Sequence, residues 1–283
     1  MSQPVAVVTD STAYLQPAEV EQLGIIVIPL QVIVGDRTLD DGTQIDVAGL
    51  AAALKDWSPV STSRPAPQRF AEIYEEAAAR GAREVVSIHL SGALSGTVDS
   101  ARLAAQDAPI PVDVVDSRSL AMGLGFPVLA AAKAAQQGLS RPEVAAMAKR
   151  CAEAAHSFFY VDTLEHLRRG GRIGAAATFL GSALAIKPLL HITGGTIAPL
   201  EKVRTSTRAL ARLEDLAIRA AGPHPVDIAV HHLAAPTRAQ TLADHLTTRI
   251  PTITTIRILE VGPAVAVHTG PGMLAVTVAP TPN

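Results

Sequence analysis

Three hydroxyl groups in the segment SGALSGT, those of Ser91, Ser95 and Thr97, are spaced to bind an anion. The segment follows an apolar run, EVVSIHL, and precedes TVDSARLAAQ, which favours a helix. A strand-to-helix junction offers backbone N–H groups and the positive end of a helix dipole in addition to the hydroxyls. The segment therefore predicts a site for an anionic group. The alternative is a structural turn in which serine and threonine cap the helix.

The spacing within this segment disfavours three familiar motifs. A P-loop requires Gly-Lys-Ser/Thr, and the segment contains no lysine. A dinucleotide fingerprint requires G-x-G-x-x-G, and a hydrolase nucleophile elbow requires G-x-S-x-G, whereas the order here is G-A-L-S-G. Binding of a nucleoside triphosphate is therefore not expected.

A second hydroxyl-rich segment, STSRP at residues 61–65, also follows apolar residues and precedes a helix-like run. On its own, this segment is explained by helix capping. His268 ends a predicted strand, AVAV, and opens the turn TGPG, and a lone histidine in that place is more often structural than functional. Neither feature identifies a site without further support.

Four arginines lie near predicted element ends. Arg168, Arg169 and Arg172 surround a Gly-Gly pair, where they suit a helix C-terminus because cations are favoured there. Arg204 follows the apolar run that ends at Val203, which suits an exposed charge at a strand end. These structural explanations need no ligand.

Metal ligation is not indicated. His231 and His232 are adjacent in a predicted strand, so their side chains point to opposite faces and cannot share a metal. The single cysteine, Cys151, cannot form an intrachain disulfide, and the chain has no paired thiolates. Asp10 resembles the aspartate of a phosphoaspartyl loop only weakly, because the second aspartate is missing, and a cap or a domain-bridging turn suits it better.

Composition excludes several classes of protein. Of 283 residues, 48% are hydrophobic and 18% charged, which predicts a folded chain. The net charge of −2, without basic blocks, disfavours nucleic-acid binding. The apolar runs are shorter than the roughly 18 residues that span a bilayer, and no signal peptide is visible. We therefore expect a cytoplasmic protein without stable membrane insertion.

The first half of the chain, residues 1–156, alternates apolar runs with helix-like segments. This pattern predicts a parallel sheet covered by helices on both faces, a three-layer α/β/α domain. Within it, GIIVIPLQVIV is expected to form one strand and residues 58–67 a loop.

The second half, residues 157–283, is dominated by hairpin signals. LLHI-TGG-TIAPLEKV predicts a hairpin with its turn at residues 193–195, and AAATFLGSALAI predicts an apolar helix. The tail TITTIRILEVGPAVAVHTGPGMLAVTV predicts up to three strands. We expect a two-layer domain with a mixed sheet and helices on one face.

In their order along the whole chain, these segments resemble the DegV family of bacterial fatty-acid-binding proteins. The resemblance rests on VTDSTAYL, TSRP, LSGALSGT, VVDSRSLAMGLG, FYVDTLEHLRRGGRI, IKPLLHI, PLEKVRT and HTGPG. It implies the same two-domain α/β architecture, with one long-chain fatty acid between the domains. It also implies a non-enzymatic role without cofactor, as the lipid carrier subunit of a separate ATP-dependent fatty acid kinase that makes the acyl phosphate.

The resemblance also implies roles for individual residues. Thr62, Ser91, the N–H of Gly92 and His268 match the positions that bind the fatty-acid carboxylate. Arg172 and Arg204 match positions for kinase docking or acyl phosphate contact. A possible additional head-group loop comprises Ser63, Ser95 and Thr97. The chain departs from the family in two places, with glycine for serine at Gly92 and arginine for glutamine at Arg64.

One expectation about His268, two alternative functions and a set of tunnel candidates complete the predictions for this site. A protonated His268 would donate to the carboxylate, and its titration near neutral pH would tune affinity. An alternative function is a serine-dependent acyl hydrolase or acyl-transferase that uses Ser91 or Ser95 with His268, and a further alternative is a phosphatase that uses Asp10. Candidates for the lining of an acyl tunnel are Ile28, Leu120, Met122, Phe126, Phe158, Phe179, Leu184 and Ile186.

Overall fold

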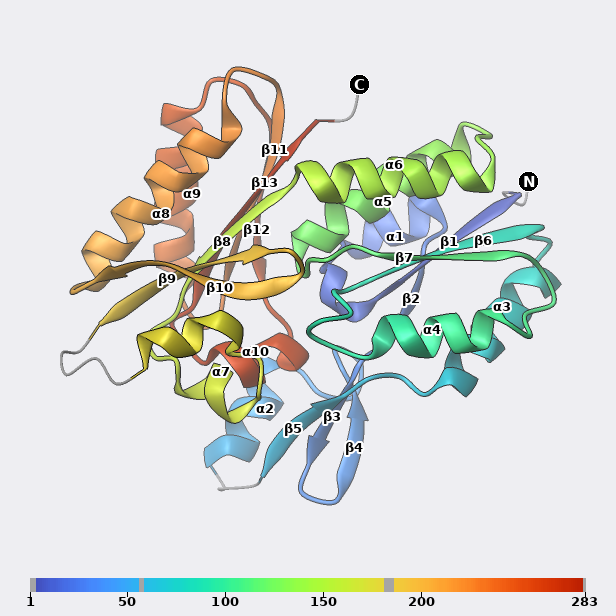
Figure 1. Cartoon of the computed structure of the whole chain (residues 1–283), viewed down its shortest axis with the longest axis horizontal. Coiled ribbons are helices and arrows are strands. Elements are labelled where there is room, and N and C mark those ends of the chain that lie inside the picture. The colour runs from blue at the N-terminus through green and yellow to red at the C-terminus, as the bar shows by residue number, and fades with distance from the viewer. Residues whose placement is uncertain (1–3, 56–58, 181–185, 282–283) are drawn as a thin grey trace. The chain divides into compact units, whose positions relative to one another are not determined.

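The computed structural model describes residues 4–55, 59–180 and 186–281, and the chain divides into two compact units (Figure 1). The first unit comprises Met1–Glu153 and the second Ala154–Asn283. Each unit has its own sheet and its own core.

The first unit is built on a four-stranded parallel sheet with the strand order β2-β1-β6-β7. Its strands are β1 (Val5–Asp10), β2 (Ile26–Ile28), β6 (Glu84–His89) and β7 (Val112–Asp116). The central strands are apolar almost without alternation because both faces of the sheet are covered. Val7 and Val8, successive residues of β1, are both at most 1% exposed although they face opposite sides.

Helices cover both faces of this sheet (Figure 1). On one face, Phe70 and Tyr74 of α3 and Ala101 of α4 pack with Val8 and Val85 in the core. On the other face lie α1, α5 and α6, of which α5 is buried along almost its whole length. The bounds are η1 (Ser11–Ala13), α1 (Pro17–Leu23), α3 (Pro67–Ala79), α4 (Thr97–Ala105), α5 (Met122–Gln136) and α6 (Arg141–Ala154). The three-layer α/β/α prediction is confirmed.

A small antiparallel sheet in the first unit was not predicted. Its strand order is β4-β3-β5. The strands are β3 (Gln31–Val34), β4 (Arg37–Asp40) and β5 (Val60–Ser63), and α2 (Val47–Lys55) lies between β4 and β5 in the chain. The expected single strand over GIIVIPLQVIV is wrong because Pro29, which has no N–H to donate, separates β2 from β3. The expected loop at residues 58–67 is partly wrong, because β5 pairs with β3 there.

The second unit is built on a six-stranded mixed sheet with the order β10-β9-β8-β13-β11-β12. Only β11 and β12 pair in parallel, and every other neighbouring pair is antiparallel. Helices α8 and α9 pack on one face, where Leu213 and Leu246 are fully buried against the sheet. The strands are β8 (His156–Tyr160), β9 (Lys187–Thr193), β10 (Thr196–Val203), β11 (Val226–His232), β12 (Ile253–Glu260) and β13 (Leu274–Pro280). The predicted mixed sheet is confirmed.

Two predictions for the second unit need correction, and one is confirmed. The hairpin forms as expected, with Thr196 of β10 opposite Thr193 of β9. The residues AVAV do not form a strand, because they lie in helix α10 (Pro263–Thr269), which begins with proline and ends at Gly270, at φ +72°. The first part of AAATFLGSALAI forms the 3-10 helix η2 (Gly174–Phe179), and residues 181–185 lie outside the described residues. The other helices are α7 (Glu165–Arg169), α8 (Ser206–Ala221) and α9 (Pro236–Arg249).

Candidate functional site

The loop between β6 and α4 folds tightly around Ser91. Ser91 is 1% exposed, and its N–H donates to the carbonyl of Ser119 at 2.8 Å. Its carbonyl accepts from the N–H of Ser95 at 3.1 Å, and its Oγ accepts from the N–H of Ala93 at 3.2 Å. The loop is therefore held in one conformation by its own backbone, with the Ser91 hydroxyl on the inner side of the turn.

The N–H of Gly92 has an acceptor inside the protein. It donates to the carboxylate of Asp116, at 3.3 Å to Oδ1 and 3.2 Å to Oδ2. A Cβ added at Gly92 would lie 3.0 Å from Asp116 Oδ2, so a side chain at position 92 would press on that carboxylate. The N–H of Gly92, which was predicted to bind the fatty-acid carboxylate, thus already donates to the carboxylate of Asp116.

The TSRP segment adjoins this loop in the first unit. Thr62 and Ser63 lie in β5, half-buried, with Thr62 opposite Val32 of β3. The side chain of Arg64 lies directly over Gly96, because a Cβ there would be 2.9 Å from Arg64 Cδ. The two hydroxyl-rich segments therefore meet at Arg64 and Gly96. Arg64 therefore places a cation on the loop that the sequence predicts to bind an anion.

The other hydroxyls of the loop bind each other. Ser95 Oγ and Thr97 Oγ1 are 2.9 Å apart, and Thr97 is fully buried at the first position of α4. For Ser95 and Thr97, this contact fits the alternative interpretation, in which the hydroxyls stabilise the turn.

In the second unit, His268 packs against the end of helix α7. A Cβ added at Gly170 would overlap the imidazole, at 2.7 Å from Cε1, so only glycine leaves room for the ring. Arg172 Nη1 donates to the carbonyl of Gly170 at 2.6 Å, which places a guanidinium next to the same backbone. The structure therefore brings together His268 and Arg172, as the C-terminal half of the predicted site requires.

The pKa of His268 is far from neutral. Burial, and to a lesser extent the nearby guanidinium of Arg172, lowers it to about 4. His268 is consequently a neutral imidazole at pH 7. The expectation that its titration near neutral pH tunes affinity is wrong for this environment, because burial and a neighbouring cation both oppose protonation.

Arg204 occupies a different setting from Arg172. It is exposed between β10 and α8, directly before Thr205, which caps α8 by accepting from the N–H of Arg208 at 3.3 Å. Arg168 and Arg169 both pair with Glu165, at 2.7 Å each, as expected for cations at a helix end. Arg204 is thus exposed before the start of a helix, whereas Arg168 and Arg169 lie at the end of one.

A buried polar network beneath the Ser91 loop was missed by the sequence analysis. Tyr74 Oη donates to Ser87 Oγ at 2.9 Å, Ser87 Oγ lies 2.7 Å from His89 Nε2, and His89 Nδ1 lies 3.1 Å from Asp10 Oδ2. The same Asp10 oxygen accepts from the N–H of Leu90 at 2.9 Å. Ser87 and His89 are two apart in a strand and share a face, which is the signal that could have revealed the network.

This network has the residue types of a hydrolase triad, but its geometry indicates a structural role. Ser87, His89 and Asp10 are all 0% exposed, so no substrate reaches the serine. Burial also raises the pKa of Tyr74 to about 12, which keeps its hydroxyl protonated as a donor. Asp10 also caps η1, as predicted, by accepting from the N–H of Thr12 at 3.1 Å. The network fixes the end of β6 immediately before Ser91.

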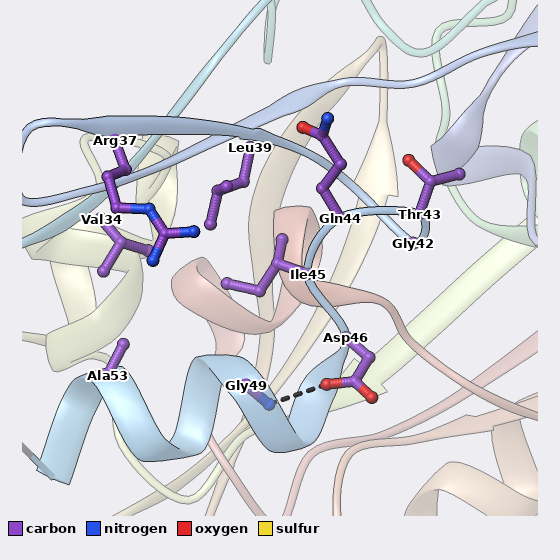
Figure 2. A pocket seen from close by; sticks show the side chains of 10 residues that line it. All are labelled: Val34, Arg37, Leu39, Gly42, Thr43, Gln44, Ile45, Asp46, Gly49 and Ala53. Carbon is purple, nitrogen blue, oxygen red and sulfur yellow. Dashed lines mark hydrogen bonds between the residues drawn. The ribbon is translucent and has the colours of Figure 1, made fainter.

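A pocket of about 470 Å³ lies elsewhere in the first unit, between the β3-β4 hairpin and α2 (Figure 2). Figure 2 shows apolar side chains of Val34, Leu39 and Ile45 around this space, with Arg37 beside them. None of the predicted head-group residues lines it. Among the tunnel candidates, Ile28 belongs to the core under α3 and α4, Phe158 packs on the core under α8 and α9, and Leu184 lies outside the described residues.

Neither a metal centre nor a membrane-spanning helix is found among the residues that the structure describes. No group of three or more His, Cys, Asp or Glu side chains is placed to hold a metal ion there. In that same part of the chain, no helix is both long and apolar enough to cross a membrane.

The fold and these loops define a two-unit α/β protein, and the chain belongs to the DegV family. The model of this family of uncharacterised proteins matches residues 4–281. A DegV domain-containing protein of Streptomyces coelicolor, SCO2569, is 54% identical over 278 residues, which cover 98% of this chain and 99% of that protein.

Two solved structures are similar along their whole length. A DegV family protein from Thermus thermophilus, described for its fatty acid binding, matches with a TM-score of 0.93 and 31% identity, covering 98% of this chain and 100% of the other. DegV from Bacillus subtilis, a fatty acid binding protein, matches with a TM-score of 0.90 and 32% identity over 99% and 100% of the two chains.

Proposed function

We propose that this chain is a non-catalytic carrier that binds one long-chain fatty acid and presents its carboxylate to a separate ATP-dependent fatty acid kinase in the cytoplasm. The observation that carries the proposal is the end-to-end similarity, above 30% identity, to two DegV proteins that bind fatty acids. In this proposal, the chain's own loops would supply the donors that such a ligand needs.

In this proposal, the head group is held by donors from both units. A carboxylate cannot leave water without hydrogen-bond donors, and donors to an ionised group form the strongest hydrogen bonds. Thr62, Ser91 and the N–H of Gly92 would contribute from the first unit. His268 would contribute a ring N–H from a neutral imidazole, and Arg172 would add a nearby positive charge. Ser63, Ser95 and Thr97 would support the loops.

Affinity would come mainly from the hydrocarbon chain. About fifteen buried methylenes at ~0.8 kcal/mol each contribute roughly 12 kcal/mol, against an association cost of ~4 kcal/mol or more. No covalent bond to the protein is needed for retention through purification. The kinase would provide the phosphoryl transfer, with Arg172 and Arg204 available for docking or for contact with the acyl phosphate.

The test is mass spectrometry of the purified protein under denaturing conditions. The proposal predicts an unmodified chain together with about one equivalent of free long-chain fatty acid. The competing acyl hydrolase or acyl-transferase predicts an acyl adduct on Ser91 or Ser95, or turnover of a chromogenic ester that His268→Ala abolishes. Either of these results would replace the carrier proposal, and magnesium-dependent release of phosphate that Asp10→Asn abolishes would favour the phosphatase alternative.

A further inference from the structure

Asp116 stands at the point where the proposed head-group loop meets the next strand. It is the last residue of β7, opposite His89 in the parallel pairing of β6 and β7, so both strands end side by side before the Ser91 loop. Asp116 is half-buried, and Oδ1 accepts from the N–H of Arg118 at 2.8 Å. The turn that supplies this N–H places Arg118 at φ +51°, a left-handed conformation that few non-glycine residues adopt.

The contact between Asp116 and Gly92 is weaker than the contact with Arg118. Hydrogen bonds to a charged acceptor are commonly 2.7–2.9 Å long. The N–H of Gly92 lies at 3.2 and 3.3 Å from the two oxygens, so it is shared between them rather than aimed at one. The Gly92 amide therefore keeps the capacity to turn toward a second acceptor while Arg118 holds Asp116 in place.

A fatty-acid carboxylate that accepts from the same amide would have Asp116 as a close neighbour. Two carboxylates at one N–H lie within the roughly 4–6 Å over which like charges strongly disfavour each other. The absence of a side chain at Gly92 lets Asp116 approach, since a Cβ there would already be 3.0 Å from Oδ2. The donors of the loop thus attract the lipid carboxylate while one fixed charge repels it.

We propose that Asp116 is an affinity-limiting residue, a fixed like charge that holds the binding of ionised fatty acid below what the head-group donors alone would give. This inference rests on the proposed fatty-acid binding. It assigns Asp116 an electrostatic role toward the ligand in addition to its hydrogen bond to the loop. A carrier with this residue releases or hands over its cargo more readily.

The test compares the affinity of delipidated full-length protein for palmitate and for hexadecanol, measured by displacement of a fluorescent fatty acid. Asp116→Asn keeps the shape and an acceptor oxygen for Arg118 and Gly92 but removes the charge. We expect about tenfold tighter binding of palmitate and unchanged binding of hexadecanol. The gain should shrink when salt is raised to 1 M, because the repulsion is screened.

The matched control is Asp113→Asn, on the same strand, whose carboxylate lies 3.2 Å from Arg141 Nε and away from the loop. It should leave both affinities unchanged. Weaker or unchanged palmitate binding in Asp116→Asn, or an equal change for hexadecanol, would overturn the inference and leave Asp116 a purely structural residue. A wild-type protein that binds neither probe would instead overturn the proposed function itself.

Discussion

At the scale of single residues, the chain separates polar side chains that serve the fold from polar side chains that are proposed to serve a ligand. Asp10 and His89 belong to the first group, because both are fully buried and both are saturated by neighbours in the first unit. His268 belongs to the second, as a neutral ring pressed against Gly170. The same residue types therefore have opposite roles, which burial and hydrogen-bond partners decide.

Replacing Asp10 should destabilise the protein without any ligand present. Asp10→Ala removes the acceptor for Thr12, for the N–H of Leu90 and for His89, all of them buried. Unmet buried donors should lower the free energy of unfolding by about 3 kcal/mol, measured by urea denaturation. Asp99→Asn, which loses only an exposed pair with Arg102, should cost less than about 0.5 kcal/mol. Equal effects for the two variants would mean that the network contributes little.

His268 should make stability depend on pH below neutrality. Its pKa is about 4 in the folded protein and near 6.5 when unfolded, so the unfolded chain binds the extra proton between these values. The free energy of unfolding should fall as pH decreases from 6.5 toward 4, by about 2 kcal/mol more in the wild type than in His268→Gln. NMR titration of the imidazole checks the cause directly, and a pKa near 6.5 in the folded protein would contradict it.

At the scale of elements, the short connections carry most of the proposed chemistry. Helix α10 is seven residues long, and it places His268 against the end of α7 through one close contact with Gly170. The β6-α4 loop and the β5 strand meet in a similar way at Arg64 and Gly96. In both places, glycine allows a neighbouring side chain to lie against the backbone.

Gly170→Ala should displace His268 from its position. The backbone at Gly170 is an ordinary helical one, with φ −74°, so the effect is steric rather than conformational. We expect a loss of about 2 kcal/mol in stability and at least tenfold less bound fatty acid after purification. The control is Gly171→Asn, because that position has φ +69°, open space and a residue type that tolerates the left-handed region. A Gly170→Ala protein with full lipid content would argue against the role of His268.

The sequence predicted the order of layers better than it predicted the short elements. Continuous apolar runs such as VAVV indicated the parallel strands, since the strands of a sheet that is covered on both faces are buried on both sides. The helix over AVAV was mistaken for a strand because it is buried on nearly every side and shows no polar periodicity. Thr62 was assigned to a loop, but it lies in β5, which pairs with the four-residue strand β3.

The candidate site was predictable as segments but not as contacts. The hydroxyl-rich spacing around Ser91 indicated an anion site, and the order of motifs indicated the family. The bond from Gly92 to Asp116 could not be foreseen, because it joins residues 24 apart through the pairing of two strands. The neutral state of His268 likewise depends on burial that the sequence does not display.

At the scale of the whole molecule, the two units divide the proposed tasks. The first unit contributes the hydroxyl and amide donors of Thr62, Ser91 and Gly92. The second contributes the imidazole and the arginines that would meet a kinase. In the proposed function, such a chain would keep the tail of the fatty acid out of water and leave its carboxylate within reach of the kinase's ATP.

Arg204→Ala should separate binding from presentation. Arg204 is exposed before α8 and has no place in the proposed head-group set, so the variant should retain its full fatty acid content. Formation of acyl phosphate by an added fatty acid kinase should slow at least fivefold, followed as ATP consumption. Arg208→Ala, exposed one turn further along α8, is the control. A loss of lipid in Arg204→Ala would contradict the docking assignment.

The most direct measurement is a calorimetric titration of delipidated protein with a long-chain fatty acid, repeated with its methyl ester and with the Ser91→Ala and Thr62→Ala variants. We expect one equivalent of fatty acid to bind, the ester to bind far more weakly, and each variant to lose about 1 to 3 kcal/mol of binding free energy. Binding of acid and ester with equal affinity, unaffected by either variant, would contradict a head group held by these two loops.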